Sequence, residues 1–264
     1  MRVFDFNSAI VRTPAPTVIN GLRAEPGPPP DFATLQHEHS RYVAALTEAG
    51  LRVTVLDALE QFPDSIFVED PALVFGDSAI LLRPGAPSRL AESRELLSTL
   101  SARFARVLEL DDGFADGGDI LVTPREVLIG LSARTDQTGA RHLQRLLASL
   151  GRASRVVSVP RGTLHLNTDC SLIDEETVLA TEVLAASGEL KAFRILTMPA
   201  QERGATNALR LNETVLVRAG CPRTQDLLAH HGVNPVALPV EEIAKIDAGL
   251  SCMSLRWFDA NLQS

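Results

Sequence analysis

Three side chains of this sequence could carry out covalent chemistry together. Cys252 lies in the run Gly249–Ser254, directly before the apolar stretch Leu255–Phe258, where a loop enters a strand and exposes a nucleophile. His165 and Asp116 lie at similar junctions. A thiol, an imidazole and a carboxylate could act as nucleophile, base and orienting group. Most free cysteines are small buried hydrophobic residues, so the prediction depends on all three groups occurring together.

The segments that carry these residues recur along the chain. A short acidic or polar segment, here called a polar knot, is followed by an apolar strand in four places, which begin at residues 67, 114, 164 and 206. Each knot leads into a second short apolar run, at residues 78–82, 126–129, 177–180 and 214–217. Helical stretches such as 89–104 and 138–150 follow, and then further strands such as 106–110 and 154–159. The repeating unit is therefore strand, strand, helix, strand.

The N-terminal segment supplies a fifth unit, with strands in residues 4–11, a helix at 32–49 and a closing strand at 51–56. Such units cannot bury their own apolar faces, so radial stacking about an axis is the natural closure. The sequence predicts an α/β fold, a pseudo-fivefold α/β propeller forming one domain over residues 1–264, with the polar knots at its centre. A doubly wound α/β sheet would explain the helix spacing. It would not explain why Asp and His recur at the same place in successive units.

Composition narrows the class of protein. The chain has 264 residues, of which 45% are hydrophobic, and a formal net charge of -8. This charge argues against a nucleic-acid partner. Three widely spaced cysteines without a CxxC pair indicate neither a disulfide framework nor a structural zinc site, and favour the reducing cytoplasm. No signal peptide or membrane span is indicated. The sequence does not decide between a monomer and a homodimer.

One irregular segment could cover a site. Residues 21–31 are rich in proline and glycine, which excludes a helix or a central strand. We expect a surface loop there, and a lid over the site is its functional interpretation.

Five motifs together resemble a known group of enzymes. They are Phe67–Asp70, Asp116–Asp119, Gly130–Thr135, Leu164–Leu166 and Gly249–Ser254. In this order they resemble the guanidine-modifying superfamily and, within it, the dimethylarginine dimethylaminohydrolases, over essentially the whole chain. The resemblance implies hydrolysis of Nω-methylated L-arginines to L-citrulline and a methylamine, through a covalent thiouronium adduct on cysteine and with neither metal nor cofactor.

The resemblance also implies roles for individual residues. Cys252 would be the nucleophile, and His165 the general acid and then the base. Asp116 would hold the charge pattern near His165 and the guanidinium, and Asp70 would accept guanidinium N–H groups. Substrate contacts are implied for a further set, in which the arginines clamp the substrate carboxylate and the leucine and isoleucine act through backbone carbonyls: Arg89, Arg134, Asp64, Glu69, Leu22 and Ile246.

Two alternatives remain open at this point. An arginine deiminase or an amidinotransferase belongs to the same superfamily, but deiminases are longer and typically have arginine where this chain has Ser251. Their His-x-Asp pattern also differs from His165-Leu166-Asn167. A non-enzymatic propeller, similar to ribosome anti-association factors, would lack the nucleophile, acid and carboxylate set that this chain has.

Overall fold

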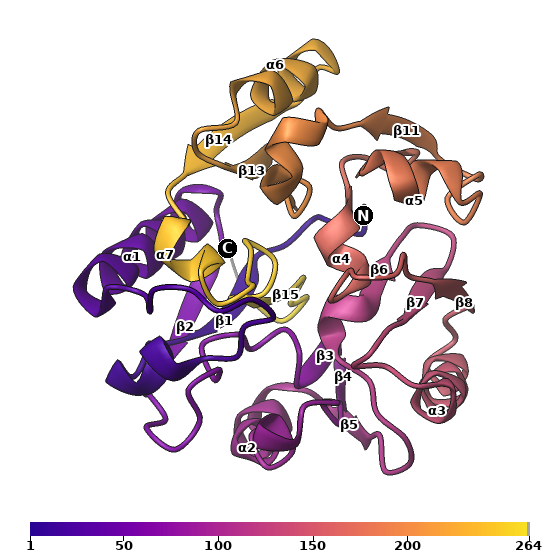
Figure 1. Ribbon diagram of the computed structural model, residues 1–264. Coiled ribbons are helices and arrows are strands. Elements are labelled where there is room, and N and C mark those ends of the chain that lie inside the picture. Colours follow the sequence, from indigo (N-terminus) through magenta and orange to yellow (C-terminus); the bar gives the residue numbers. More distant parts are fainter. Residues whose placement is uncertain (263–264) are drawn as a thin grey trace.

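Five small sheets stand around a central axis (Figure 1). The computed structural model describes residues 1–262. Each sheet has three strands, and its middle strand pairs antiparallel with the inner strand and parallel with the outer one. This arrangement confirms the predicted pseudo-fivefold propeller of strand, strand, helix, strand units.

Four of the units follow one another along the chain. The first contains β3 (Ala72–Phe75), β4 (Ser78–Leu81), the 3₁₀ turn η2 (Pro87–Arg89), α2 (Arg94–Arg103) and β5 (Arg106–Glu109). The second contains η3 (Gly117–Asp119), β6 (Ile120–Val122), β7 (Val127–Leu131), α3 (Gln137–Ser149) and β8 (Ser154–Ser158). The third contains α4 (Leu166–Asp169), β9 (Cys170–Leu172), β10 (Thr177–Ala180), α5 (Glu182–Ala186) and β11 (Arg194–Thr197). The fourth contains η4 (Ala200–Ala205), β12 (Leu209–Leu211), β13 (Thr214–Arg218), α6 (Pro222–His230), β14 (Asn234–Leu238) and α7 (Glu241–Ala244).

The fifth unit is built from both ends of the chain. It contains β1 (Ser8–Arg12), η1 (Pro16–Asn20), α1 (Phe32–Glu48) and β2 (Arg52–Leu56), and its inner strand is β15 (Leu255–Trp257). The prediction of strands over residues 4–11 is confirmed for residues 8–11, which lie in β1, and is wrong for residues 4–7. The Asn212 side chain accepts from the Phe6 N–H and donates to the Phe6 carbonyl, so this part of the backbone is satisfied without a strand partner. Closure by β15 places Cys252 at the axis.

The sheets join into a closed ring through their apolar faces. Five buried clusters each combine residues of two neighbouring sheets. Each of the first four units packs on the next one along the chain, and the fifth unit also packs on the first, which closes the ring. No unit buries its apolar surface alone, which is the physical reason for the ring.

The helices α1, α2, α3, α5 and α6 lie on the outside of the ring, whereas α4 lies near its middle (Figure 1). In α3 an apolar stripe of Ala140, Leu143 and Leu147 is buried, and Asp136 caps the helix by accepting from the Gly139 N–H. The helix predicted from residue 89 begins only at Arg94. Pro87 starts a separate 3₁₀ turn that ends at Arg89, and the chain bends after it so that the Arg89 side chain is buried.

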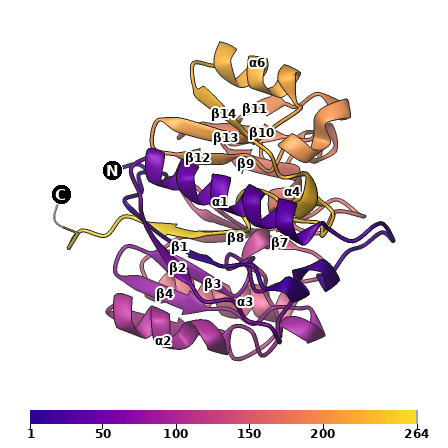
Figure 2. The ribbon, with the colours of Figure 1, turned by 90° about the vertical axis from the view of Figure 1, so that its left-hand side faces the viewer.

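The two ends of the axis differ. Figure 2 shows both chain termini on one side of the molecule, whereas the indigo loop of residues 21–31 extends from the opposite side. Among the described residues, no helix has the length and apolar character needed to cross a membrane.

Candidate active site

Four functional side chains come from equivalent places in four units. Asp70 precedes β3, Asp116 immediately precedes η3, His165 immediately precedes α4, and Cys252 precedes β15. Each lies just before the inner strand of its sheet. Because the inner strands stand around the axis, the ring brings together residues that are up to 182 positions apart (Asp70 to Cys252) in the sequence.

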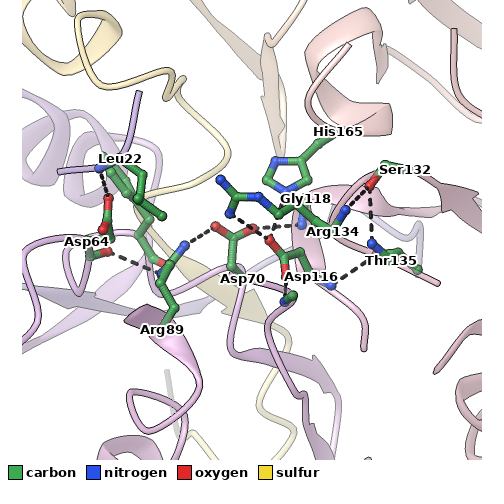
Figure 3. Close-up of polar contacts among 12 residues, drawn as sticks. Leu22, Asp64, Asp70, Arg89, Asp116, Gly118, Ser132, Arg134, Thr135 and His165 are labelled. Atoms are coloured by element: carbon green, nitrogen blue, oxygen red, sulfur yellow. Dashed lines mark hydrogen bonds and ion pairs between the residues drawn. The ribbon is translucent and has the colours of Figure 1, made fainter. Parts of the chain in front are cut away.

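A buried polar cluster forms where these residues meet. The His165 Nε2 atom lies 2.9 Å from Asp116 Oδ2, and both residues are buried. Asp116 Oδ1 accepts from the Gly85 N–H at 2.7 Å, which fixes the carboxylate. Asp70 Oδ1 accepts from the Gly118 N–H at 3.0 Å. Figure 3 shows the side chains of Asp70, Asp116 and His165 pointing toward one another.

The carboxylates keep the imidazole cationic. Burial opposes the charged form of His165, but Asp70, Asp116 and Asp119 outweigh it and raise the His165 pKa to about 9. Burial also favours the neutral form of Asp70, yet Arg89 and His165 hold its pKa below the usual range. At neutral pH the cluster therefore contains an imidazolium ready to donate a proton.

The Cys252 thiol is neutral when no substrate is bound. Burial raises its pKa, and the nearby carboxylates of Glu69 and Asp70 raise it further. The Gly249 N–H donates to Cys252 Sγ at 3.4 Å, and the Cys252 carbonyl accepts from the Glu69 N–H at 3.1 Å. These bonds tie the nucleophile's turn to the segment that carries Asp70.

A small cavity joins these groups. It has a volume of about 30 Å³ and is lined by Leu22, Asp64, Phe67, Asp70, Arg89, Arg134, Leu164, His165, Ile246, Asp247, Ala248 and Cys252. Ligand pockets typically measure about 300–1,000 Å³, so this one is small for a ligand. A larger cavity of about 380 Å³ is lined by the chain's first residues and the inner strands. The larger cavity contains neither Cys252 nor His165 in its lining, so we assign the chemistry to the smaller one.

The segment of residues 21–31 reaches the small cavity through Leu22, which lines it. The Leu22 N–H donates to Asp64 Oδ1 at 2.9 Å, and the Ala24 N–H donates to Asp247 Oδ2. The Asp31 N–H donates to Glu242 Oε2 at 2.6 Å. Backbone N–H groups on the loop thus meet carboxylates on the body of the protein. The lid function of this segment stays a prediction.

The two predicted arginine clamps have different surroundings. Arg134 Nη1 lies 3.6 Å from Asp116 Oδ2, with its side chain stretched across the cavity (Figure 3). Arg89 is buried and donates to both Glu92 oxygens, to Asp70 Oδ2 at 2.5 Å and to the carbonyls of Asp64 and Phe67. In this arrangement Arg89 orients Asp70. To bind a substrate carboxylate, Arg89 would have to give up some of these hydrogen bonds.

Glu69 lies elsewhere than the resemblance implies. Its side chain lines the larger cavity and accepts from Ser251 Oγ at 2.7 Å and from Arg256 Nη2 at 3.4 Å. A direct side-chain contact with a substrate in the small cavity is therefore not supported. Leu22, Asp64 and Ile246 do line the small cavity.

Sequence reasoning missed several residues that support the site. Glu92 binds Arg89 three residues away, Asp247 meets the lid, and Asn207 accepts from the Ser251 N–H and donates to Ser251 Oγ. The repeat offered a signal for Asn207, because it stands in the fourth polar knot. Nothing in the local sequence marks Asp247 or Glu92.

The same cluster has ligand atoms suited to a cation. One atom each of Asp70, Asp116 and His165 lie within 4.8 Å of one another. Two carboxylates and an imidazole can bind a divalent metal, but the carboxylates equally suit a planar guanidinium. Because His165 is held as an imidazolium, a metal would first have to displace its proton. The expectation that the enzyme needs no metal stays a prediction.

Comparison with known sequences gives a consistent result. The family model described as arginine deiminase matches residues 59–217. The N(G),N(G)-dimethylarginine dimethylaminohydrolase of Pseudomonas aeruginosa is 35% identical over 254 residues, which cover 96% of this chain and all of the relative. The protein of the same name from Streptomyces coelicolor is 33% identical over 253 residues, covering 94% of this chain and 96% of that relative.

Solved structures agree in fold. The Pseudomonas aeruginosa enzyme, as a cysteine-to-serine mutant complexed with citrulline, superposes with a TM-score of 0.92 at 35% identity, covering 96% of this chain and all of that one. A histidine-to-glycine dimethylarginine dimethylaminohydrolase, as an adduct with S-methyl-L-thiocitrulline, also has a TM-score of 0.92 at 35% identity, covering 95% and 99% of the two chains.

Proposed function

This chain belongs to the dimethylarginine dimethylaminohydrolase family, and on that premise we propose that it hydrolyses Nω-methylated L-arginines to L-citrulline and dimethylamine or methylamine. The observation that carries the proposal is the small cavity lined by Cys252, His165 and Asp70, with Asp116 hydrogen-bonded to the histidine. A thiol, an imidazolium and two carboxylates are what the hydrolysis of a cationic guanidinium requires.

Binding begins with the substrate cation. The guanidinium N–H groups meet the carboxylates of Asp70 and Asp116 in charge-assisted hydrogen bonds. Arg134 carries the same chemical group and lies 3.6 Å from Asp116 in the empty site. The substrate therefore takes the place of the Arg134 guanidinium, which becomes free to bind the substrate's α-carboxylate. Leu22 and the rest of the lid then close over the amino-acid end.

Substrate binding also activates the thiol. In the empty site, burial and the carboxylates keep Cys252 protonated. A bound guanidinium brings positive charge beside the sulfur and lowers the thiol pKa again. The thiol proton passes to solvent water, and the thiolate forms only when its target is in place. This coupling protects the nucleophile from other electrophiles.

The chemistry then proceeds in two halves. The Cys252 thiolate attacks the guanidinium carbon, and His165 donates its proton to the departing methylamine, which leaves a thiouronium on the sulfur. The neutral imidazole next takes a proton from water. The resulting hydroxide attacks the same carbon and the thiolate is expelled. The thiolate takes the proton of the added hydroxyl group, which gives citrulline and the Cys252 thiol, while His165 is again an imidazolium. Asp116 holds the imidazole by the 2.9 Å contact throughout.

The test compares three substrates with one enzyme preparation. Citrulline formation is measured with asymmetric dimethylarginine, monomethylarginine and arginine. We expect turnover of the methylated substrates, abolished by Cys252→Ser and retained by Cys221→Ser, because Cys221 lies outside the cavity. Turnover of arginine alone would instead identify an arginine deiminase. Transfer of the amidino group to an added amine, without citrulline, would identify an amidinotransferase.

A further inference from the structure

We infer that Asp119 is a positioning residue that holds Asp116, Arg134 and His165 in their working arrangement. The inference rests on the proposed function for the roles of those three residues. Asp119 does not line the catalytic cavity, and it is fully buried. It acts through two hydroxyl groups and one backbone N–H, which reach three different catalytic segments.

The two hydroxyls share one carboxylate oxygen. Ser132 Oγ lies 2.6 Å and Thr135 Oγ1 lies 2.7 Å from Asp119 Oδ2. Because an ionised carboxylate only accepts hydrogen bonds, both hydroxyls must donate to it. Their lone pairs are then directed away from Asp119 and can only accept. The carboxylate therefore sets the direction of both hydroxyls.

Each oriented hydroxyl fixes one functional residue. Thr135 Oγ1 accepts from the Asp116 N–H at 3.1 Å, and Ser132 Oγ accepts from the Arg134 N–H at 2.9 Å. Figure 3 shows both contacts beside the Asp116 and Arg134 side chains. Ser132 Oγ also accepts from the Thr135 N–H at 3.2 Å, so both of its lone pairs are used.

The other carboxylate oxygen reaches the third unit. Asp119 Oδ1 accepts at 3.0 Å from the N–H of Leu166, the residue after His165. The backbone that carries the imidazole is thereby held against the turn that carries Asp116. One carboxylate thus connects the residues at the reacting carbon with the arginine that would bind the far end of the substrate.

An asparagine cannot reproduce this pattern. If the amide oxygen of Asp119→Asn accepts from the two hydroxyls, its NH₂ group faces the Leu166 N–H, and two donors oppose each other. In the flipped orientation the NH₂ group faces Ser132 Oγ, whose lone pairs are already used. Since a displacement of about 1 Å can cost about 100-fold in rate, we expect Asp119→Asn to lower kcat/KM for dimethylarginine by about 10- to 100-fold.

Variants of the hydroxyls separate the two branches. Thr135→Val keeps the shape and loses the Asp116 branch, whereas Thr135→Ser keeps the hydroxyl and should restore at least half of the wild-type kcat. The kcat of Thr135→Val should fall more with dimethylarginine than with S-methyl-L-thiocitrulline, because a thiolate leaving group depends less on the proton from His165. Ser132→Ala should instead raise KM for dimethylarginine, through Arg134.

Alkylation by 2-chloroacetamidine gives a readout that needs no hydrolysis. This amidine has no amino-acid end, so its reaction with Cys252 should slow more in Asp119→Asn and Thr135→Val than in Ser132→Ala. If wild type is alkylated but forms no citrulline, the proposed function fails, and the alkylation rates still decide the role of Asp119.

Asp169→Asn is the matched control. Asp169 is as buried as Asp119 but accepts from Thr163 Oγ1 and Arg203, which do not line the catalytic cavity. It should lower the melting temperature and leave kcat/KM within twofold of wild type. Equal losses of activity in both variants at matched stability would overturn the inference. Equal effects of Thr135→Val and Thr135→Ser on kcat would also overturn it. These two variants still test the inference if Asp119→Asn does not fold.

Discussion

Titration of His165 should change the stability of the folded protein at alkaline pH. The histidine pKa rises from its ordinary value of 6.5 to about 9 on folding, because Asp70, Asp116 and Asp119 surround the buried imidazole. A group whose pKa is raised by folding contributes stability that is fully present below its unfolded pKa. This contribution is lost as the pH rises through the folded pKa.

The size of the effect follows from the shift. Each pKa unit corresponds to about 1.4 kcal/mol, so the imidazolium contributes about 3 kcal/mol at pH 6 that is lost by about pH 10. Replacing His165 by Gln removes the titration while retaining a side chain that can donate to Asp116. The comparison is made in a Cys252→Ser background, because the thiol also has a raised pKa and would lose stability over the same range.

The assay is denaturant unfolding at a series of pH values. We expect the difference in unfolding free energy between Cys252→Ser and Cys252→Ser/His165→Gln to shrink by about 3 kcal/mol from pH 6 to 10, with its midpoint between the two pKa values. A difference that is constant over this range, or that grows with pH, would refute the claim that the carboxylates hold His165 as a cation.

Four further predictions concern activity and stability. Cys252→Ser should abolish turnover and retain substrate binding, since the hydroxyl is far less nucleophilic; steady-state rates within tenfold of wild type would contradict the assignment. Arg134→Lys should raise KM for dimethylarginine by about 10- to 100-fold, corresponding to about 1–3 kcal/mol, with a smaller effect on kcat, because lysine cannot form the bidentate contact; an equal loss with methylguanidine would exclude the clamp. Arg89→Met should lower the unfolding free energy by about 3–5 kcal/mol, because two buried carboxylates lose their counter-ion; a change below about 1 kcal/mol in denaturant unfolding would argue against this orienting role. Dialysis against a chelator should leave activity unchanged; loss of activity that added metal restores would show that the three-ligand cluster binds a metal.

The repeat was visible in the sequence because it depends on local order. Five equivalent units are predicted by the recurrence of polar knots before apolar strands and of helices with apolar residues three and four positions apart. Ring closure follows from the unit, because no unit can bury its own apolar face. The residue types of His165 and Asp116, each in a polar knot, and of Cys252, before an apolar strand, similarly indicate a proton carrier, a carboxylate and a nucleophile at the centre. These expectations need only neighbours in the chain.

Tertiary structure decided where individual side chains point and what they bind. Asp70 and Glu69 are adjacent, yet the turn that carries them directs their side chains to different cavities. Arg89 binds Asp70 and Glu92 in the empty site, and Asp119 gathers hydroxyls from another loop. β15 completes the sheet of β1 from the far end of the chain. Such contacts depend on which segments the ring brings together, because a buried charge must find its partner wherever packing places one. The local sequence does not show which distant segments lie close together in the folded protein.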